Sequence, residues 1–383
     1  MKDNKEYMKD VYNKIEQEKN NISEFYKTNI GTSKRPKMFN MVASLLLATV
    51  ILTTGTFAGI EIYKGITVTP AFQQDVNSNT NVLWCGTFQL IWNDLMDIYT
   101  KGEPVEFIGY ESPLANELNK RSFTADMLSV DSYYKVHGVQ TLALKEQIEK
   151  DLKEKFNENS RILDNFSWDN EHYLLYCMLK KEFNFLTPFD QLEKDYFANS
   201  DMIVKYFGIN EDSSKELYDN VEVLWYNTNM DFAVKLFTKE HEEVILYRMN
   251  EDKSLDALYR DVSIKSNNYT GNKKFLKTDT LKVPYMEVDK VLSYDEICGH
   301  QIKGTDYLIE KAIQTIKFNL DNKGGKLVSE AAMQVDCTAF LPDDEVTPRH
   351  FDFTNEYVIF LKEADKEKPY FASKVIDDEM LVK

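Results

Sequence analysis

The sequence predicts an α+β domain that follows one transmembrane helix. Three patterns lead to this prediction: an uncharged apolar run near the N-terminus, apolar residues at helical spacing in the first half, and apolar residues at alternate positions from about residue 221 onward. Helical patterns early in a chain and strand patterns late are typical of the α+β class. The 383 residues, 43% of them hydrophobic, suffice for a sizeable packed core.

The transmembrane prediction rests on residues 38–60, which carry no charge over 23 consecutive positions. A helix rises about 1.5 Å per residue and needs about 20 apolar residues to cross the hydrocarbon. Lys34, Arg35 and Lys37 flank the run on its N-terminal side, so the positive-inside rule leaves residues 1–37 in the cytoplasm. We therefore expect a single-pass protein of the cell membrane, in contact with lipid, whose C-terminal domain is extracytoplasmic.

Two other interpretations of the apolar run are a cleaved signal peptide and a buried soluble helix. Thr56-Phe57-Ala58 fits a cleavage site, but the 37 residues before the run far exceed a signal peptide's charged region. Residues 61–81 are predicted to be a polar stalk and residues 82–383 the exported domain. Residues 1–37 either hold a cytoplasmic partner or form a solvated helix next to the membrane.

Composition and cysteine spacing exclude some functions. The formal net charge is −17, which disfavours a nucleic-acid partner because neutralising phosphates requires clustered Lys and Arg. Cys85, Cys177, Cys298 and Cys337 are widely spaced and form no C-x-x-C pair, so they predict buried thiols rather than a disulfide framework, although pairing cannot be read from sequence.

The sequence lacks the usual catalytic and metal-binding motifs. His241-Glu242-Glu243 begins like a helical zinc motif, but Ile245 stands where the second His is needed. Cys298 and His300 would share one face of a strand, yet nothing else supports a nucleophile and base there. Asp343-Asp344-Glu345 is interpreted as a solvated acidic loop. We predict no enzymatic activity, no cofactor and no metal site.

Periodicity places the main elements. Apolar residues at helical spacing predict a buried helix over 87–99 and a one-faced surface helix over 144–156, whereas alternating residues predict the strands. The predicted strands are 232–236 and 244–246 (a hairpin), 281–288 with Pro284 suggesting a sheet edge, 316–320, 357–361 and 370–375.

The segment after residue 320 decides between two interpretations. Asp321-Asn322-Lys323-Gly324-Gly325 is predicted to be a turn, and the strand that follows has small or apolar residues at alternate positions. Such slim side chains suit insertion between two strands that helices already cover. Alternatively, residues 316–320 and 327–337 form a permanent hairpin. The alternating small or apolar positions are Ser329, Ala331, Met333, Val335, Cys337 and Ala339.

These motifs, taken in order, resemble the serpin superfamily. Ser329-Glu330-Ala331-Ala332 resembles the family's hinge, Phe353 with 357–361 the aromatic strand after the reactive loop, and 370–375 the last strand. Phe185-x-x-Pro188-Phe189-Asp190, with Phe197 beyond, is similar to the motif that follows the third strand of the main sheet. The resemblance implies a large mixed or antiparallel sheet covered by helices.

The resemblance also implies a function: inhibition of a serine or cysteine protease by insertion of the loop into the sheet. The implied bait bond lies among Phe340, Leu341, Pro342 and Asp343. The sequence departs from the family where Val328 replaces the hinge glycine and where Met333 and Gln334 replace small residues. Because bulky hinge residues slow insertion, the alternative is a non-inhibitory exported binding or sensing domain coupled to the cytoplasmic segment.

Overall fold

The computed structural model describes residues 66–73, 80–169, 172–198, 200, 202–249, 253–327 and 348–383, all within the unit Gly65–Lys383. The predicted cytoplasmic segment and the predicted transmembrane run lie outside these residues. Among the helices of the ranges just given, none combines the length and the apolar character needed to cross a bilayer.

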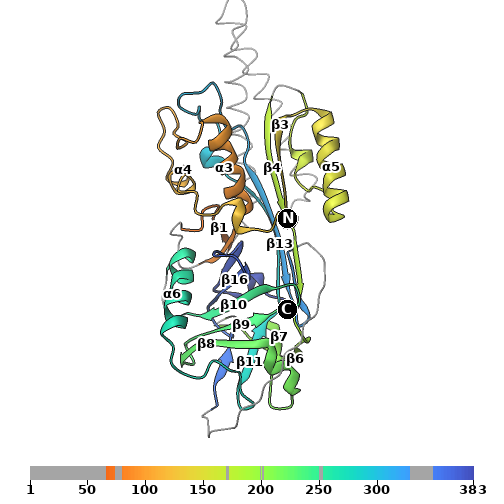
Figure 1. The fold of residues 1–383 in the computed structure, drawn as a ribbon, viewed down its shortest axis with the longest axis vertical. Coiled ribbons are helices and arrows are strands. Elements are labelled where there is room, and N and C mark those ends of the chain that lie inside the picture. Colours follow the sequence, from red (N-terminus) through yellow and green to blue (C-terminus); the bar gives the residue numbers. More distant parts are fainter. Residues whose placement is uncertain are drawn as a thin grey trace, which may run out of the picture. The chain divides into compact units, whose positions relative to one another are not determined.

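The α+β class predicted from the sequence is confirmed, and sheets dominate the architecture (Figure 1). The widest sheet has the order β1-β2-β17-β16-β10-β9-β8. The predicted hairpin is β9–β10, and the two predicted C-terminal strands are β16 and β17, which are buried along their whole length. The strands of this sheet are β1 (Ile66–Val68), β2 (Asn81–Cys85), β8 (Val221–Thr228), β9 (Asp231–Phe237), β10 (Glu242–Arg248), β16 (Tyr357–Glu363) and β17 (Phe371–Val375).

The remaining strands form two sheets of four and a pair. The orders are β15-β11-β7-β6, β12-β13-β14-β5 and β3-β4. Only Lys180 separates β4 from β5, so one run of chain pairs first with β3 and then with β14. The bounds are β3 (Tyr133–Val139), β4 (Tyr173–Leu179), β5 (Lys181–Asn184), β6 (Asp190–Tyr196), β7 (Ile203–Ile209), β11 (Thr280–Pro284), β12 (Met286–Ser293), β13 (Ile313–Leu320), β14 (Gly324–Leu327) and β15 (His350–Asp352).

The single strand predicted over 281–288 is two strands in different sheets. The chain leaves β11 at Pro284 and enters β12 at Met286, with Tyr285 between them. Pro284 has no backbone N–H to donate, so the ladder of β11 ends there. The edge prediction is also wrong, because β11 lies between β15 and β7.

The two predicted helices are confirmed. Helix α5 starts after Thr141, whose hydroxyl accepts a hydrogen bond from the backbone N–H of Leu144, and it ends at Asn157 in the left-handed conformation. Its buried stripe packs with residues of β4. The helices are α3 (Thr87–Tyr99), α4 (Pro113–Leu118), α5 (Leu142–Phe156) and α6 (Leu255–Asn268), with 3₁₀ turns at Ala125–Met127, Val130–Ser132, Leu163–Asn165, Lys215–Asn220, Asp295–Ile297 and Asp378–Met380.

Residues 66–73, expected in a polar stalk, belong to the packed unit. Strand β1 pairs in parallel with β2, and the side chains of Ala71 and Phe72 are buried. The Phe72 ring centroid lies 4.6 Å from that of Trp84 in β2. Burying an aromatic side chain typically stabilises a fold by about 1.5–3 kcal/mol. The predicted stalk therefore does not extend over these residues.

Candidate functional site

The candidate site begins at β14, a short strand held on both of its edges. Residues Lys326 and Gly325 pair with Asn319 and Leu320 of β13, and on the other side all four residues pair with β5, from Gly324 opposite Asn184 to Leu327 opposite Lys181. Of the second strand in the hairpin alternative, 327–337, the described residues include Leu327 alone, and Gly324 and Gly325, which were expected in the turn, lie in β14.

The local sequence explains the hairpin. The Asp321 carboxylate accepts hydrogen bonds from the backbone N–H groups of Lys323 (2.7 Å) and Gly324 (3.2 Å), which closes the turn. A Cβ atom at Gly324 would lie 1.9 Å from the carbonyl oxygen of Phe183, and one at Gly325 would lie 2.3 Å from the Phe183 ring. Only glycine permits β14 to approach β5 this closely.

Beyond the Leu327 end of β14, a gap separates β4 from β13, and we call it the slot. Its upper end is the end next to β14 and its lower end is the end next to Tyr173, which is the reverse of the vertical direction in Figure 1. Among the residues that the structure describes, the edges of β4 and β13 that face each other make no backbone hydrogen bonds across the gap. Both strands line one cavity of about 1190 Å³. Strand edges carry rows of N–H and C=O groups that favour pairing with another strand. The slot therefore has the chemistry to receive one extended segment between two edges.

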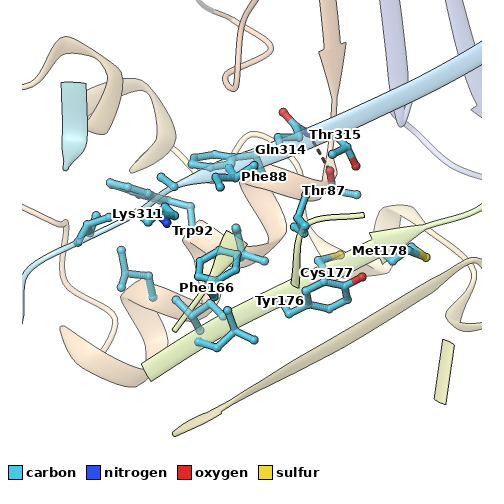
Figure 2. Close-up of a pocket in the computed structure, with 18 of the residues that line it drawn as sticks. Thr87, Phe88, Trp92, Phe166, Tyr176, Cys177, Met178, Lys311, Gln314 and Thr315 are labelled. Carbon is cyan, nitrogen blue, oxygen red and sulfur yellow. Dashed lines mark hydrogen bonds between the residues drawn. The ribbon is translucent and has the colours of Figure 1, made fainter. Parts of the chain in front are cut away.

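The floor of the slot is helix α3. Phe88 and Trp92 of α3 lie between the ribbons of β4 and β13 in Figure 2, and both are buried. The Trp92 Nε1–H donates to Asn119 Oδ1 at 3.1 Å, which satisfies its polar atom. Gln314 of β13 donates to Thr87 Oγ1 at 2.8 Å and fastens that strand to the start of the helix. An apolar face of an inserted strand would meet this floor.

Cys177 of β4 lies in one wall of the slot as a free thiol. Burial raises the pKa of this thiol, so it is protonated at neutral pH and reacts slowly as a nucleophile. Cys85 is a free, buried thiol and Cys298 is a free, half-buried one, whereas Cys337 lies outside the described residues.

The segment after α5 crosses the slot opposite the floor. Arg161 Nη1 forms an ion pair with Asp289 Oδ1 of β12 at 2.7 Å, and Lys311 Nζ donates to the Asn165 carbonyl oxygen at 2.5 Å. Phe166 of the same segment lines the cavity (Figure 2). These contacts join the chain that follows α5 to the far wall, so the slot is covered on this side.

A buried charged cluster lies where β14 ends. Lys181 Nζ contacts Glu242 Oε1 at 2.5 Å and Glu363 Oε1 at 2.6 Å, and all three side chains are buried. Burial raises the pKa of Glu242, one of whose carboxylate oxygens has no hydrogen-bond partner. Burial also acts to raise the pKa of Glu363, but hydrogen bonds from Lys181 and Ser129 outweigh it and lower that pKa.

The structure leaves the predicted site residues outside its described ranges. These are the hinge and inserting-strand residues Ser329, Glu330, Ala331, Ala332, Met333, Val335 and Cys337, the bait region Phe340–Asp343, and the membrane-flanking Lys34, Arg35 and Lys37. The Phe185, Phe189 and Phe197 side chains of the family-like motif are buried, with the rings of Phe185 and Phe189 4.8 Å apart.

Cys298 and His300 are not arranged as a nucleophile and base. The Cys298 thiol donates to the Tyr294 carbonyl oxygen at 3.4 Å, and the His300 ring stacks on Tyr110 with a centroid separation of 3.9 Å. Sequence reasoning found the floor helix but missed both the β4 wall and the covering segment. The continuous apolar run of β4, YLLYCML, is a signal for a strand buried on both faces.

Comparison with known proteins gives matches in structure alone. No family model and no curated protein matches the chain. Among solved structures, the chain is similar to Serpin48 of the insect Tenebrio molitor, with 12% identity over 76% of this chain and 95% of that one and a TM-score of 0.39. The serpin from Schistosoma mansoni is another solved structure to which the chain is similar, with 15% identity over 61% of this chain and 64% of that one and a TM-score of 0.36.

Two further solved structures are similar to the chain at about the same level. Serine protease inhibitor (serpin) 12 of Manduca sexta is 12% identical over 63% of this chain and 67% of that one, with a TM-score of 0.40. Thyroxine-binding globulin, solved in complex with thyroxine, is 11% identical over 61% of this chain, with a TM-score of 0.39, and the chain spans 64% of its length.

Proposed function

We propose that this chain is a membrane-anchored serpin-like protein, displayed outside the cell, that inhibits a serine or cysteine protease by inserting residues 328–339 into the slot. One observation carries the proposal. Strand β14 is paired on both edges and its last described residue, Leu327, lies at the upper end of a gap between two unpaired strand edges. The chain that continues from Leu327 is therefore the segment best placed to enter.

The register of β14 assigns faces to the residues that would enter. Leu327 is buried opposite Lys181, so the alternate residues after it would face the α3 floor. Continuing the pairing places Ala331 opposite Cys177. These floor-facing positions are the small or apolar ones, whereas Glu330 and Gln334 would face the covering segment. Along the slot, small or apolar side chains would therefore meet the apolar floor, and these two polar side chains would point away from it.

A panel of chymotrypsin-like, trypsin-like and papain-like proteases tests inhibition by insertion. With a matching protease, the full chain is expected to form an SDS-stable complex and to melt at a higher temperature after cleavage near Phe340–Asp343. Ala331→Arg places a charge against the apolar floor and should turn the inhibitor into a substrate. Gln334→Arg, on the opposite face, should leave inhibition intact. The absence of both complex and stabilisation across the panel would overturn the proposal.

The membrane location rests on the sequence of residues 34–60. An uncleaved anchor predicts that the chain stays with membranes at alkaline pH and that protease added outside intact cells degrades the β-rich domain while sparing residues 1–37. Release of the chain into the soluble fraction would contradict anchoring and would leave the insertion proposal unaffected.

A second candidate is a non-inhibitory sensing domain that acts through residues 1–37. The ion pair between Arg161 and Asp289 supports this candidate. It holds the segment after α5 over the slot, whose upper end β14 already occupies, and so opposes the entry of another strand. This candidate predicts that a peptide of residues 1–37 retrieves a specific cytoplasmic protein. It also predicts unchanged output when Ala331→Arg blocks insertion, a result that separates the two candidates.

A further inference from the structure

Three tyrosines meet at the lower end of the slot, each from a different element. Tyr99 is the last residue of α3, Tyr173 is the first residue of β4, and Tyr307 lies in the loop before β13. Their ring centroids are 4.8 Å (Tyr99–Tyr307), 5.8 Å (Tyr173–Tyr307) and 6.0 Å (Tyr99–Tyr173) apart, all in edge-to-face geometry. All three line the cavity of the slot.

These contacts connect the floor and the two walls. Tyr173 and Tyr307 are 51% and 43% exposed, yet each ring packs on the other two and so bridges the gap from opposite sides. Edge-to-face aromatic pairs are favourable beyond the area that they bury. Beside them, His172 Nε2 lies 3.2 Å from Glu310 Oε2, a second link between the start of β4 and the chain that leads into β13.

The register of β14 shows where an inserted strand would meet this cluster. Pairing runs from Gly324 opposite Asn184 to Leu327 opposite Lys181, and each later residue moves one position down β5 and β4. In that register residue 335 would come opposite Tyr173. An incoming strand can therefore fill the upper slot while the tyrosines stay in contact, but it must separate Tyr173 from Tyr307 to go further.

We propose that Tyr99, Tyr173 and Tyr307, with the His172–Glu310 pair, form a clasp that limits how far a strand enters the slot. This inference rests on the proposed insertion and adds its regulation. With the clasp closed, insertion stops before residue 335. Opening the clasp commits the strand to the full depth.

Two native thiols report the two depths in one experiment. Cys177 lies in the upper slot, and Cys337 would enter only if insertion passes the clasp. The full chain carries an engineered cleavage site within 341–346. It is treated with iodoacetamide before and after cutting, and the alkylation rate of each cysteine is measured by mass spectrometry. Cys298, which is outside the slot, serves as the internal standard.

After cutting, the parent chain should protect Cys177 first, by at least about tenfold, and should protect Cys337 only later, once the clasp opens. Tyr307→Ala should protect both thiols at the same rate, whereas Tyr307→Phe, which keeps the ring, should behave like the parent. Glu310→Ala removes the second link without disturbing an aromatic ring and should protect Cys337 at an intermediate rate. Tyr110→Ala is the matched control, because its ring stacks on His300 and does not line the slot.

The outcomes separate the clasp from the insertion. Protection of Cys337 at the same rate in the parent and in Tyr307→Ala, with Cys177 protected in both, would overturn the clasp and leave insertion standing. Failure to protect Cys177 in every folded variant would overturn the insertion itself. Melting temperatures of the uncut variants establish which of them are folded.

Discussion

Strand β13 forms one wall of the slot region and the run β4–β5 forms the other. The upper and lower halves of these walls differ in whether a strand lies between them. At the top, β14 fills the space between β13 and β5 and pairs with both. Below it, β13 and β4 face each other across a cavity of about 1190 Å³. The walls belong to the same two runs of chain, since only Lys180 separates β4 from β5.

The difference arises from what occupies each half. At the top, two glycines let a strand lie against Phe183 without a clash, and a buried charged cluster lies underneath. Below, the rings of α3 form an apolar floor and the segment after α5 covers the gap. The upper half thus holds a strand whose first two residues are glycines, and we expect the lower half to receive a strand with small or apolar residues at alternate positions.

The upper half depends most strongly on Lys181. Lys181→Met leaves two buried carboxylates without their ammonium partner, and we expect a loss of about 3–5 kcal/mol in the free energy of unfolding at pH 7. The matched control is Lys326→Met in β14, whose ion pair with Glu182 spans 3.5 Å and is partly exposed. That substitution should cost less than about 1 kcal/mol. Urea unfolding of both variants checks the contrast; equal losses would show that the cluster is dispensable.

The same cluster predicts opposite pH trends for its two carboxylates. The raised pKa of Glu242 means that the fold gains stability from its protonation, a gain complete below the unfolded pKa and lost as pH rises through the folded one. The lowered pKa of Glu363 contributes stability above its unfolded pKa, which is lost as pH falls through the folded value. Glu242→Gln should therefore flatten the first trend alone. Denaturant unfolding between pH 4 and 8 measures it, and an unchanged slope would contradict the assignment.

Substituting a glycine of β14 should give the next largest loss in the free energy of unfolding. Gly324→Val places a side chain against the Phe183 carbonyl oxygen, a backbone atom that cannot move aside, so we expect a loss of about 1–3 kcal/mol and a loosened β14. Gly138→Ala in β3 is the control, because its Cβ would meet only the end of the Leu144 side chain at 3.3 Å. Thermal unfolding and amide exchange of Leu327 report the difference. Retained protection of Leu327 in Gly324→Val would show that β14 does not need its glycines.

Sequence reasoning found the elements whose periodicity is strong and regular. Helix α3, helix α5, the β9–β10 hairpin and strand β13 were predicted because their apolar residues recur at helical or alternating spacing. The class α+β followed from their order. A local pattern is enough where burial on one face decides the structure.

The slot itself was not predicted, for two physical reasons. Its β4 wall is apolar on both faces, because α5 covers one side and the floor lies on the other, so no alternation marks it. The split between β11 and β12 depends on which sheet each half joins, and a single run of eight residues carries no information about that. Pairing between distant strands is set by tertiary packing, which periodicity does not encode.

We expect the smallest effect on stability from weakening the segment after α5 that covers the slot. The effect on the rate of strand insertion should nevertheless be large. The Arg161–Asp289 pair is about half exposed on both sides, so Arg161→Ala should change the free energy of unfolding by less than about 1 kcal/mol. The same change frees the covering segment from β12 and should speed protection of Cys177 after the loop is cut. Lys303→Ala, which breaks an exposed pair with Glu106 away from the slot, is the control. Faster protection of Cys177 in both variants would indicate that the whole domain has become more flexible. Faster protection in Arg161→Ala alone would show that the covering segment limits the rate of insertion.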